Sequence, residues 1–231
     1  MKNILEVKNL SVSFGESKII KDLSFAVSEG EFLTILGPNG SGKTVLLKTL
    51  LGLLSGYEKN IFWREDAKIG YLPQGLTHLK VKESPLSVLE FLSLKNKNKS
   101  EIENHLKMLG IKDLSFLKKR IGTLSGGQFQ RMLMAWALFD NPNVLIFDEP
   151  TTGVDIHGEE TVYNLLRDLQ KERNLTIILI THDVNVVYKY STNVLCMSHN
   201  NICHSGPEEA LSPKRLEELY GMPVKIYKHN H

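Results

Sequence analysis

The sequence predicts an α/β fold built on a mainly parallel sheet. Three short segments are almost continuously apolar, at residues 32–36, 144–149 and 176–181, and such segments suit strands that are covered on both faces. Segments with the three- and four-residue apolar spacing of helices separate them, and strands that alternate with helices favour a parallel sheet. With 231 residues, of which 42% are hydrophobic, the chain is long enough for one large domain.

The N-terminal part is predicted to contribute strands of a different kind. Apolar residues between positions 5 and 14 follow a rough two-residue alternation, which is typical of a strand with one buried face. Residues 15–17 end this strand, a second such segment covers 23–27, and a turn follows at 28–30. We therefore expect an antiparallel β subdomain ahead of the first buried strand.

The remaining elements are placed by apolar spacing and by turn residues. A helix is predicted directly after the first buried strand, and helices predominate at about 76–120. A hairpin that turns at 199–201 and a short final helix are expected after the third buried strand. The predicted ranges are helix 43–54, strand 69–74, strand 144–149, helix 157–172, strand 176–181, hairpin 194–203 and helix 213–221.

A glycine-rich loop joins the first buried strand to the first helix. It consists of Gly37, Pro38, Asn39, Gly40, Ser41, Gly42, Lys43 and Thr44. The glycines let the backbone bend so that successive N–H groups point at phosphate oxygens, and the helix that starts here adds its positive end. The pattern assigns Lys43 to the β- and γ-phosphates of a nucleoside triphosphate and the Thr44 hydroxyl to Mg²⁺.

Two carboxylates end the second buried strand, and a histidine follows the third. Asp148 can hold the metal ion from its second sphere, and Glu149 can polarise a water molecule in line with the γ-phosphate. His182 taken alone could equally be a structural residue at a strand end. Because parallel strands share one carboxyl edge, however, we expect Lys43, Glu149 and His182 to meet there, in catalytic roles.

Gln74 ends the short strand at 69–74 and opens the helical region. Its neutral amide could contact Mg²⁺ or the attacking water molecule, and could swing away when the helical region moves. By itself the position does not distinguish this role from that of an ordinary loop residue. With it, the predicted Mg²⁺ site comprises Thr44, Gln74 and Asp148.

A second glycine-rich helix start occurs about 80 residues after the first. It consists of Ser125, Gly126, Gly127 and Gln128, and its N–H groups form another anion site at a helix terminus. One triphosphate has a single γ-phosphate, which Lys43 already holds. The second site is therefore superfluous within one subunit, unless it serves the nucleotide of a neighbouring copy. We expect a head-to-tail homodimer with two nucleotides at its interface.

Charge and cysteine content restrict the partners and the compartment. The 28 basic and 26 acidic residues leave a net charge of +2, which gives no electrostatic footprint for nucleic acid. Cys196 and Cys203 are too few for a disulfide framework, so we expect a reducing, cytosolic setting. The first residues do not resemble a signal peptide, and the most apolar stretch, 45–54, is too short to span a membrane. A membrane role would therefore require a partner.

With these motifs in place, the chain resembles the ATP-binding subunits of ABC transporters over essentially its whole length. The glycine loop, Gln74, the Leu-Ser-Gly-Gly-Gln segment at 124–128, the Asp-Glu-Pro triplet at 148–150 and His182 occur in the family's order and approximate spacing. The resemblance implies ATP and Mg²⁺ as cofactors. It also implies a P-loop NTPase (RecA-like) core, with the N-terminal antiparallel β subdomain and an inserted α-helical subdomain.

The resemblance extends to the domain plan and to single residues. Residues 1–231 would form a single ABC ATP-binding domain, with its helical subdomain at about 75–140 and a C-terminal hairpin and helix at 194–231. Phe14 resembles the aromatic residue that stacks on adenine, although it could also be a half-buried strand residue. The family roles for the other positions are Gln74 as coupling glutamine, Glu149 as general base, His182 as the residue that grips the γ-phosphate, and Asp155 in the loop that crosses the dimer seam.

The resemblance also implies partners and a location. The helical subdomain would receive a coupling helix from integral membrane permease subunits, which places the protein on the inner face of the cell membrane. An extracytoplasmic solute-binding protein would act indirectly. A narrower likeness to zinc/manganese-type importers rests on the segments 69–74, 84–88, 153–155, 194–197, 202–207 and 220–221.

We therefore predict an ATPase subunit that powers import of a divalent metal ion, zinc or manganese. Iron-chelate and haem importers share some of the same segments, and exporters share every nucleotide motif. These systems, and a soluble ABC ATPase outside transport, stay open as alternatives. The transported solute and the direction of transport lie outside this polypeptide.

The chain departs from the family pattern at three places. Val45 replaces a hydroxyl residue that often follows the loop threonine, which removes a possible bond to the α-phosphate. Because the backbone cradle remains, Val45 is still counted among the ATP-binding residues, and we expect weaker ATP binding rather than its loss. Trp136 stands where an arginine is usual, and the segment 55–68 is short.

A metal-sensing role could also be read into the C-terminal residues His199, Cys203, His204, His229 and His231. They lack the close-set ligand pairs of metal sites, so we favour the interpretation that they are ordinary residues of the hairpin and the tail.

Overall fold

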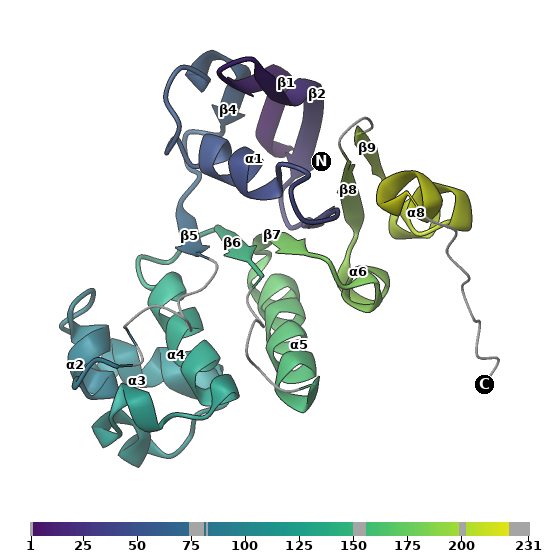
Figure 1. Ribbon diagram of the computed structural model, residues 1–231. Coiled ribbons are helices and arrows are strands. Elements are labelled where there is room, and N and C mark those ends of the chain that lie inside the picture. The colour runs from purple at the N-terminus through teal and green to yellow at the C-terminus, as the bar shows by residue number, and fades with distance from the viewer. Residues whose placement is uncertain (1, 74–80, 82, 150–155, 199–201, 222–231) are drawn as a thin grey trace. The chain divides into compact units, whose positions relative to one another are not determined.

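The computed structural model (Figure 1) describes residues 2–73, 81, 83–149, 156–198 and 202–221. The chain divides into two units, one formed by Met1–Ala67 with Ile178–His231 and the other by Lys68–Ile177. Both ends of the chain therefore belong to the first unit, and the second unit is inserted between them.

An antiparallel sheet of the order β2-β1-β4 occupies the N-terminal part of the first unit. The long strands β1 (Asn3–Phe14) and β2 (Ser17–Ser28) pair with each other, and the short strand β4 (Ile61–Trp63) pairs with the other edge of β1. Buried and exposed residues alternate roughly along β1 and β2, as the sequence predicts, and the alternation is interrupted where the register shifts. The predicted antiparallel subdomain is confirmed.

Parallel pairing in the first unit begins at the first buried strand. Strand β3 (Phe32–Leu36) is buried along its whole length and runs parallel to β8 (Asn193–Met197), while β9 (Ile202–Ser205) is antiparallel to β8. Helix α1 (Lys43–Leu50) follows β3. The other helices of this unit are η1 (Glu58–Asn60), α6 (Val184–Tyr190), α7 (Pro207–Ala210) and α8 (Pro213–Tyr220).

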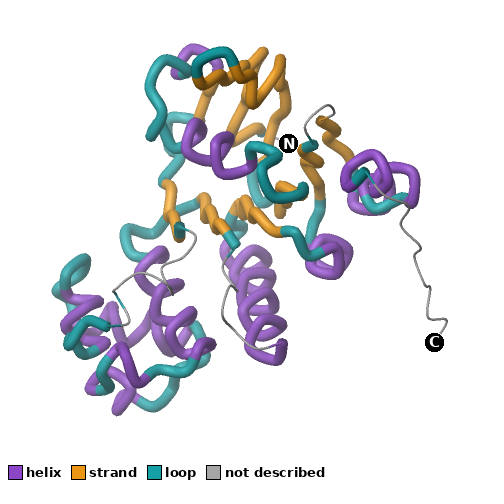
Figure 2. Tube along the Cα trace, in the orientation of Figure 1, coloured by secondary structure: helices purple, strands orange, loops and turns teal. Residues whose placement is uncertain are grey.

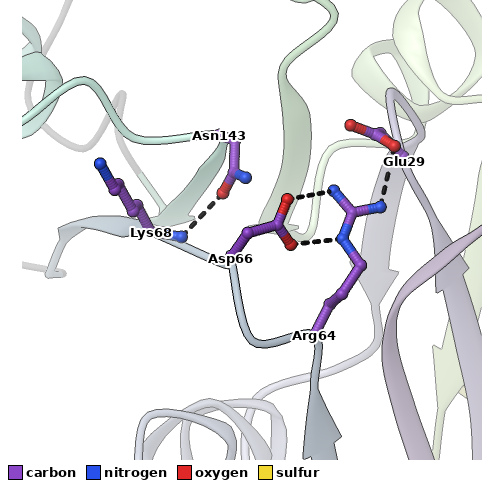
Figure 3. A network of polar contacts seen from close by, with 5 residues as sticks. All are labelled: Glu29, Arg64, Asp66, Lys68 and Asn143. Carbon is purple, nitrogen blue, oxygen red and sulfur yellow. Dashed lines mark hydrogen bonds and ion pairs between the residues drawn. The ribbon is translucent and has the colours of Figure 1, made fainter.

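Arg64, directly after β4, forms a network with two acidic side chains of the first unit (Figure 3). Its guanidinium donates to Glu29 Oε2 at 2.8 Å and to both carboxylate oxygens of Asp66. These hydrogen bonds lower the pKa of both carboxyls. The backbone N–H of Arg64 also donates to Ile4 O, so the segment after β4 is tied to β1 and to the turn before β3.

Short parallel strands form the sheet portion of the second unit. Strand β5 (Ile69–Leu72) pairs in parallel with β6 (Val144–Asp148), in the order β5-β6-β7, and β7 (Thr176–Thr181) crosses the boundary between the units. Asn143 connects the strand starts, since its side-chain oxygen accepts from Lys68 N at 2.7 Å (Figure 3) and its carbonyl accepts from the Thr176 backbone N–H at 3.0 Å.

Helices make up most of the rest of the second unit, and they gather in one cluster (Figure 2). They are α2 (Val88–Ser93), α3 (Lys99–Met108), η2 (Leu114–Lys118), η3 (Ile121–Thr123), α4 (Gly126–Leu138) and α5 (Ile156–Arg173). Local capping explains where several of them begin. Ser87 and Glu90 form a reciprocal capping box at α2, and the Asn98 side chain caps α3.

The cluster gives Trp136 a packing role that the sequence did not reveal. The Trp136 ring lies 4.7 Å from the ring of Phe91, between α4 and α2. Lys95 Nζ donates to the Trp136 carbonyl at 3.1 Å and lies 5.9 Å from the Trp136 ring centroid. Trp136 thus joins two helices of the same cluster through its large apolar ring.

The fold class matches the prediction, with differences in single elements. Helix α1 ends at Leu50 rather than at residue 54, because the chain turns at Gly52 with a φ of 68°. Strand β4 and helices α6 and α7 were not predicted. The hairpin turn at 199–201 lies outside the described residues. Among the described helices, none has the length and apolarity needed to cross a membrane.

Candidate functional site

The glycine-rich loop connects β3 to α1 in the first unit. It leaves the sheet at Gly37, which is buried, and passes through Asn39 and Gly40, which are exposed. It re-enters at Ser41 and Gly42 and continues into α1. The buried strand thus fixes one end of the loop and the helix fixes the other, so the exposed tip stands where an anion can approach the helix start.

Two glycines are required by the space and the backbone around them. A Cβ at Gly37 would lie 2.2 Å from the Met197 carbonyl oxygen, because the end of β8 presses against the loop. Gly42 caps α1 with a φ of 96°, and a Cβ there would lie 2.9 Å from Ile19 Cγ2. The sequence motif identifies both glycines. It gives no sign of Met197 or Ile19, which come from distant strands.

Polar groups inside the loop are arranged as an anion site requires. Lys43 is buried, and its Nζ donates to the carbonyls of Gly37 at 2.8 Å and Pro38 at 2.9 Å. The ammonium group is therefore held over the loop. Ser41 Oγ is buried and, among the described residues, has no hydrogen-bond partner. A buried polar atom of this kind calls for a ligand or a water molecule.

The start of α1 carries no side-chain cap. Its first intrahelical bond runs from Leu46 N to Gly42 O at 2.8 Å. Thr44 and Val45 are partly buried in this first turn, and the Val45 carbonyl accepts from Thr49 Oγ1 at 2.7 Å. The N-terminal end of the helix, with its positive dipole, is thus left to an external acceptor.

The predicted carboxylates lie at the end of β6 in the second unit. Asp148 is 2% exposed, and burial together with the Asp148 charge raises the pKa of Tyr71, on the neighbouring strand β5, to about 12. Glu149 adopts a φ of 47°, in the left-handed region that side chains other than glycine rarely occupy. Such strain clusters at functional sites. Sequence reasoning found Glu149 but had no signal for its backbone conformation.

Two further residues predicted for the nucleotide site, His182 and Phe14, are exposed. His182 is exposed directly after β7, and the backbone N–H of the next residue, Asp183, bonds to Thr181 Oγ1. Phe14 is 52% exposed at the end of β1, a position open for stacking. Lys43 and His182 belong to the first unit and Glu149 to the second, so their convergence stays a prediction. Gln74 and Asp155 lie outside the described residues.

The second glycine-rich helix start differs from the first in its hydrogen bonds. Ser125 is the N-cap of α4, and its hydroxyl accepts from Gln128 N at 3.3 Å. In return, the Gln128 side-chain oxygen accepts from Ser125 N at 3.3 Å. Gly127 lies in open space, since a Cβ there would meet nothing within 4 Å. Among the described residues, therefore, neither space nor backbone requires a glycine at 127.

The C-terminal histidines and cysteines show no metal-binding arrangement in the part of the chain that is described. No group of three or more metal-ligating side chains occurs among those residues. The His204 ring lies edge-on to Phe25 at 6.1 Å, and burial lowers its pKa. His199, His229 and His231 lie outside the described residues.

Comparison with known proteins identifies the family. A family model described as "ABC transporter" matches residues 20–152. The chain is 39% identical over 221 residues to a Thermotoga maritima protein named "Probable metal transport system ATP-binding protein", covering 94% of this chain and 90% of the relative. It is 35% identical over 233 residues to the zinc import ATP-binding protein ZnuC of Mannheimia succiniciproducens, covering 99% and 87% of the two chains.

Solved structures agree with this result. A protein described as a metal-chelate type ABC transporter in an inward-facing conformation has a TM-score of 0.85 at 26% identity, covering 96% of this chain and 90% of that one. A dimeric ATP-binding cassette in a post-hydrolysis state, bound to ADP and Pi, has a TM-score of 0.69 at 25% identity, covering 88% and 98%. The resemblance identified from the sequence motifs is confirmed.

Proposed function

The chain belongs to the ABC transporter family, and from that premise we propose that it is the ATP-hydrolysing subunit that powers import of a divalent metal ion, zinc or manganese, through a membrane permease. The observation that carries the choice of solute is the likeness, along nearly the whole chain, to relatives named for zinc import and metal transport. We treat residues 1–231 as one ABC ATP-binding domain, with a helical subdomain at about 75–140.

The loop between β3 and α1 is proposed to hold the ATP phosphates. Ser41 Oγ, buried without a partner among the described residues, and the uncapped start of α1 supply polar groups that suit phosphate oxygens. Lys43 would exchange its two carbonyl partners for the β- and γ-phosphates. Phe14, exposed at the end of β1, would stack on the adenine.

Oxygen ligands support a Mg²⁺ site beside the phosphates. Mg²⁺ prefers hydroxyl, carboxylate and phosphate oxygens together with water molecules. The Thr44 hydroxyl at the start of α1 and the buried Asp148 carboxylate at the end of β6 are donors of this kind. Gln74 would add an amide oxygen.

Hydrolysis is assigned to side chains that follow the buried strands. Glu149 would accept a proton from the attacking water molecule, and its left-handed backbone is strain of the kind that clusters at functional sites. His182 would contact the γ-phosphate, and Lys43 would stabilise the charge that develops on it.

Two copies are proposed to complete each site. The second helix start supports this, because no described residue gives a steric reason for glycine at 127, whereas the phosphate of a neighbouring copy could use the open space. Ser125, Gly126, Gly127 and Gln128 would face the partner's nucleotide, and Asp155 would lie at the dimer seam. A solved relative, a dimer of ATP-binding cassettes with bound ADP and Pi, supports a two-copy assembly.

The remaining partners follow from import. Because no described helix can cross a membrane, the permease must provide the path, and the helical subdomain would receive its coupling helix. The protein would then lie on the cytoplasmic face of the membrane, and an extracytoplasmic solute-binding protein would deliver the metal to the permease. Nucleic acid is not among the proposed partners, since the net charge is +2.

Transport and hydrolysis can be tested in one preparation. The subunit is co-purified with its permease, placed in vesicles together with the extracytoplasmic solute-binding protein, and assayed for ATP-dependent uptake of radioactive zinc and manganese. We expect uptake of at least one metal, and a loss of about 10²–10³-fold in hydrolysis for Glu149→Gln, which should also form a stable dimer with ATP. Unchanged turnover in that variant would remove the proposed base. Uptake of neither metal by an actively hydrolysing preparation would contradict the proposed solute.

A metal chelate is the second candidate solute. It is favoured by the structural neighbour described as a metal-chelate type transporter, whose TM-score is 0.85. The same vesicles decide between the two, because uptake of an iron chelate with exclusion of free zinc and manganese would select this alternative.

A further inference from the structure

The two cysteines of the chain face each other across β8 and β9. Cys196 and Cys203 are register partners in this antiparallel pair, and both thiols are free. Partners in an antiparallel pair have Cα atoms about 4.5–5.5 Å apart, which lies within the range of about 4.4–6.8 Å that a disulfide spans. The thiols also hydrogen-bond to each other.

A small pocket lies beside this pair. Its walls are formed by Cys196, Ser198, Cys203, Arg215, Glu218 and Leu219. Cys203 is partly buried, whereas Cys196 is 4% exposed and belongs to the apolar cluster beneath α7 and α8. A reagent that approaches from the solvent therefore meets Cys203 first.

The surroundings give the two thiols unequal reactivity. The hydrogen bond from Cys196 lowers the pKa of Cys203, and the positive charge of Arg215 acts in the same direction, against burial and the charge of Glu209. The same bond and burial raise the pKa of Cys196. Cys203, which is also the more exposed thiol, is thus the better nucleophile of the pair. Arg215 is held in place by Glu218 at 3.0 Å and Glu209 at 3.6 Å.

A metal ion fits this pair less well. Zinc takes four ligands in a tetrahedron, and no third histidine, cysteine or carboxylate joins the two thiols in the described part of the chain. The Arg215 guanidinium, which lies in the wall of the same pocket, would also repel a cation.

We propose that Cys203 and Cys196 form a thiol–disulfide exchange site for small disulfides, with Cys203 as the attacking thiol and Cys196 as the resolving thiol. In the first step the Cys203 thiolate attacks a disulfide RSSR, forms a mixed disulfide and releases one RS⁻. In the second step Cys196 loses its proton to water and attacks the Cys203 sulfur, which releases the second RS⁻. The product is a Cys196–Cys203 disulfide, and RSSR is reduced to two thiols.

The test uses the full chain with oxidised glutathione and follows intact mass and free-thiol content without denaturant. For the wild-type protein we expect a product two hydrogens lighter, with both thiols consumed and recovered by dithiothreitol. Cys196→Ser should stop at a stable glutathione adduct on Cys203. Cys203→Ser should react about tenfold more slowly than Cys196→Ser, because its remaining thiol is buried and protonated.

Circular dichroism spectra and ATP binding show whether each variant is folded. The proposal is overturned if the wild type keeps both thiols, if it accumulates a stable adduct without closing the disulfide, or if the two serine variants react at equal rates. The exchange requires neither nucleotide nor permease, so its result is independent of the proposed transport function.

Discussion

The two glycine-rich helix starts, at α1 and at α4, use their first turns in opposite ways. Helix α1 begins at Gly42 without a side-chain cap, and Lys43 folds back onto the loop carbonyls. Helix α4 begins at Ser125 with a complete capping box, in which Ser125 and Gln128 satisfy each other. The N–H groups at the start of α1 therefore need an external hydrogen-bond acceptor, whereas the start of α4 is capped by side chains of its own helix.

This difference separates two reasons for a glycine-rich sequence. At Gly37 and Gly42 the reason lies inside the chain, in close contacts and in a left-handed backbone. At Gly127 the part of the chain that the structure describes gives no such reason, since an added Cβ would meet none of it within 4 Å. The comparison thus teaches that the first motif is explained by contacts inside its own unit, while the second leaves open space among the described residues, which we propose is used by a second copy.

The largest effect is expected from changes at α4. Gly127→Ala should stabilise the monomer by up to about 1 kcal/mol, because alanine is the better helix former. It should nevertheless lower ATP hydrolysis by about 10²-fold, because the methyl group would occupy the space proposed for the partner's phosphate. Thermal unfolding and steady-state phosphate release measure the two effects.

Ser125→Ala is the matched variant for this experiment. It should lower hydrolysis as well, but it should destabilise the chain by about 1 kcal/mol, because α4 loses its cap. Normal hydrolysis by Gly127→Ala would show that the start of α4 does not approach a phosphate.

Gly37→Ala should have the next largest effect. Its Cβ would lie 2.2 Å from the Met197 carbonyl, so the loop or the end of β8 must shift. Overpacking of this kind costs about 1–3 kcal/mol, which corresponds to roughly 5- to 150-fold weaker ATP binding if the loop absorbs it. Isothermal titration measures the affinity. Gly206→Ala, whose Cβ would meet nothing within 4 Å, is the control and should bind ATP normally.

A gain is expected at the third position of α1. Val45→Ser would restore a hydroxyl that can bond the α-phosphate, and one such bond contributes about 0.5–1.5 kcal/mol. ATP affinity should rise by roughly 2- to 12-fold, while Val45→Ala should give no gain. If serine and alanine behave alike, Val45 does not face the phosphates.

The smallest effect is expected at the scaffold behind α1. The Trp63 indole bonds the Leu50 carbonyl at the end of α1, and the next residue, Arg64, holds Glu29 and Asp66. Arg64 lowers the pKa of both carboxyls from their ordinary values of 4.5 and 3.8 in the folded state.

That lowering contributes stability at pH values above the unfolded pKa values, and the contribution is lost as the pH falls through the lower, folded values. Arg64→Gln should therefore lower the melting temperature slightly at pH 7. The difference from the wild type should shrink below about pH 4 and should also shrink in high salt. A difference that grows on acidification would contradict this assignment.

Local patterns predicted much of the fold. The apolar runs predicted β3, β6 and β7, because a strand covered on both faces needs apolar residues at every position. The short strand β4 and the helices α6 and α7 were not predicted. Each is too short for a periodic signal, so contacts with residues far away in the chain decide its structure.

The sequence by itself determined the family and predicted the phosphate loop and the two carboxylates, because phosphate and metal chemistry require particular residue types at fixed spacing. Only the tertiary structure decided why Gly37 must be glycine, that Trp136 packs on Phe91, and that Cys196 faces Cys203. These facts depend on strand register and side-chain packing between distant segments. Such contacts leave no local pattern along the chain.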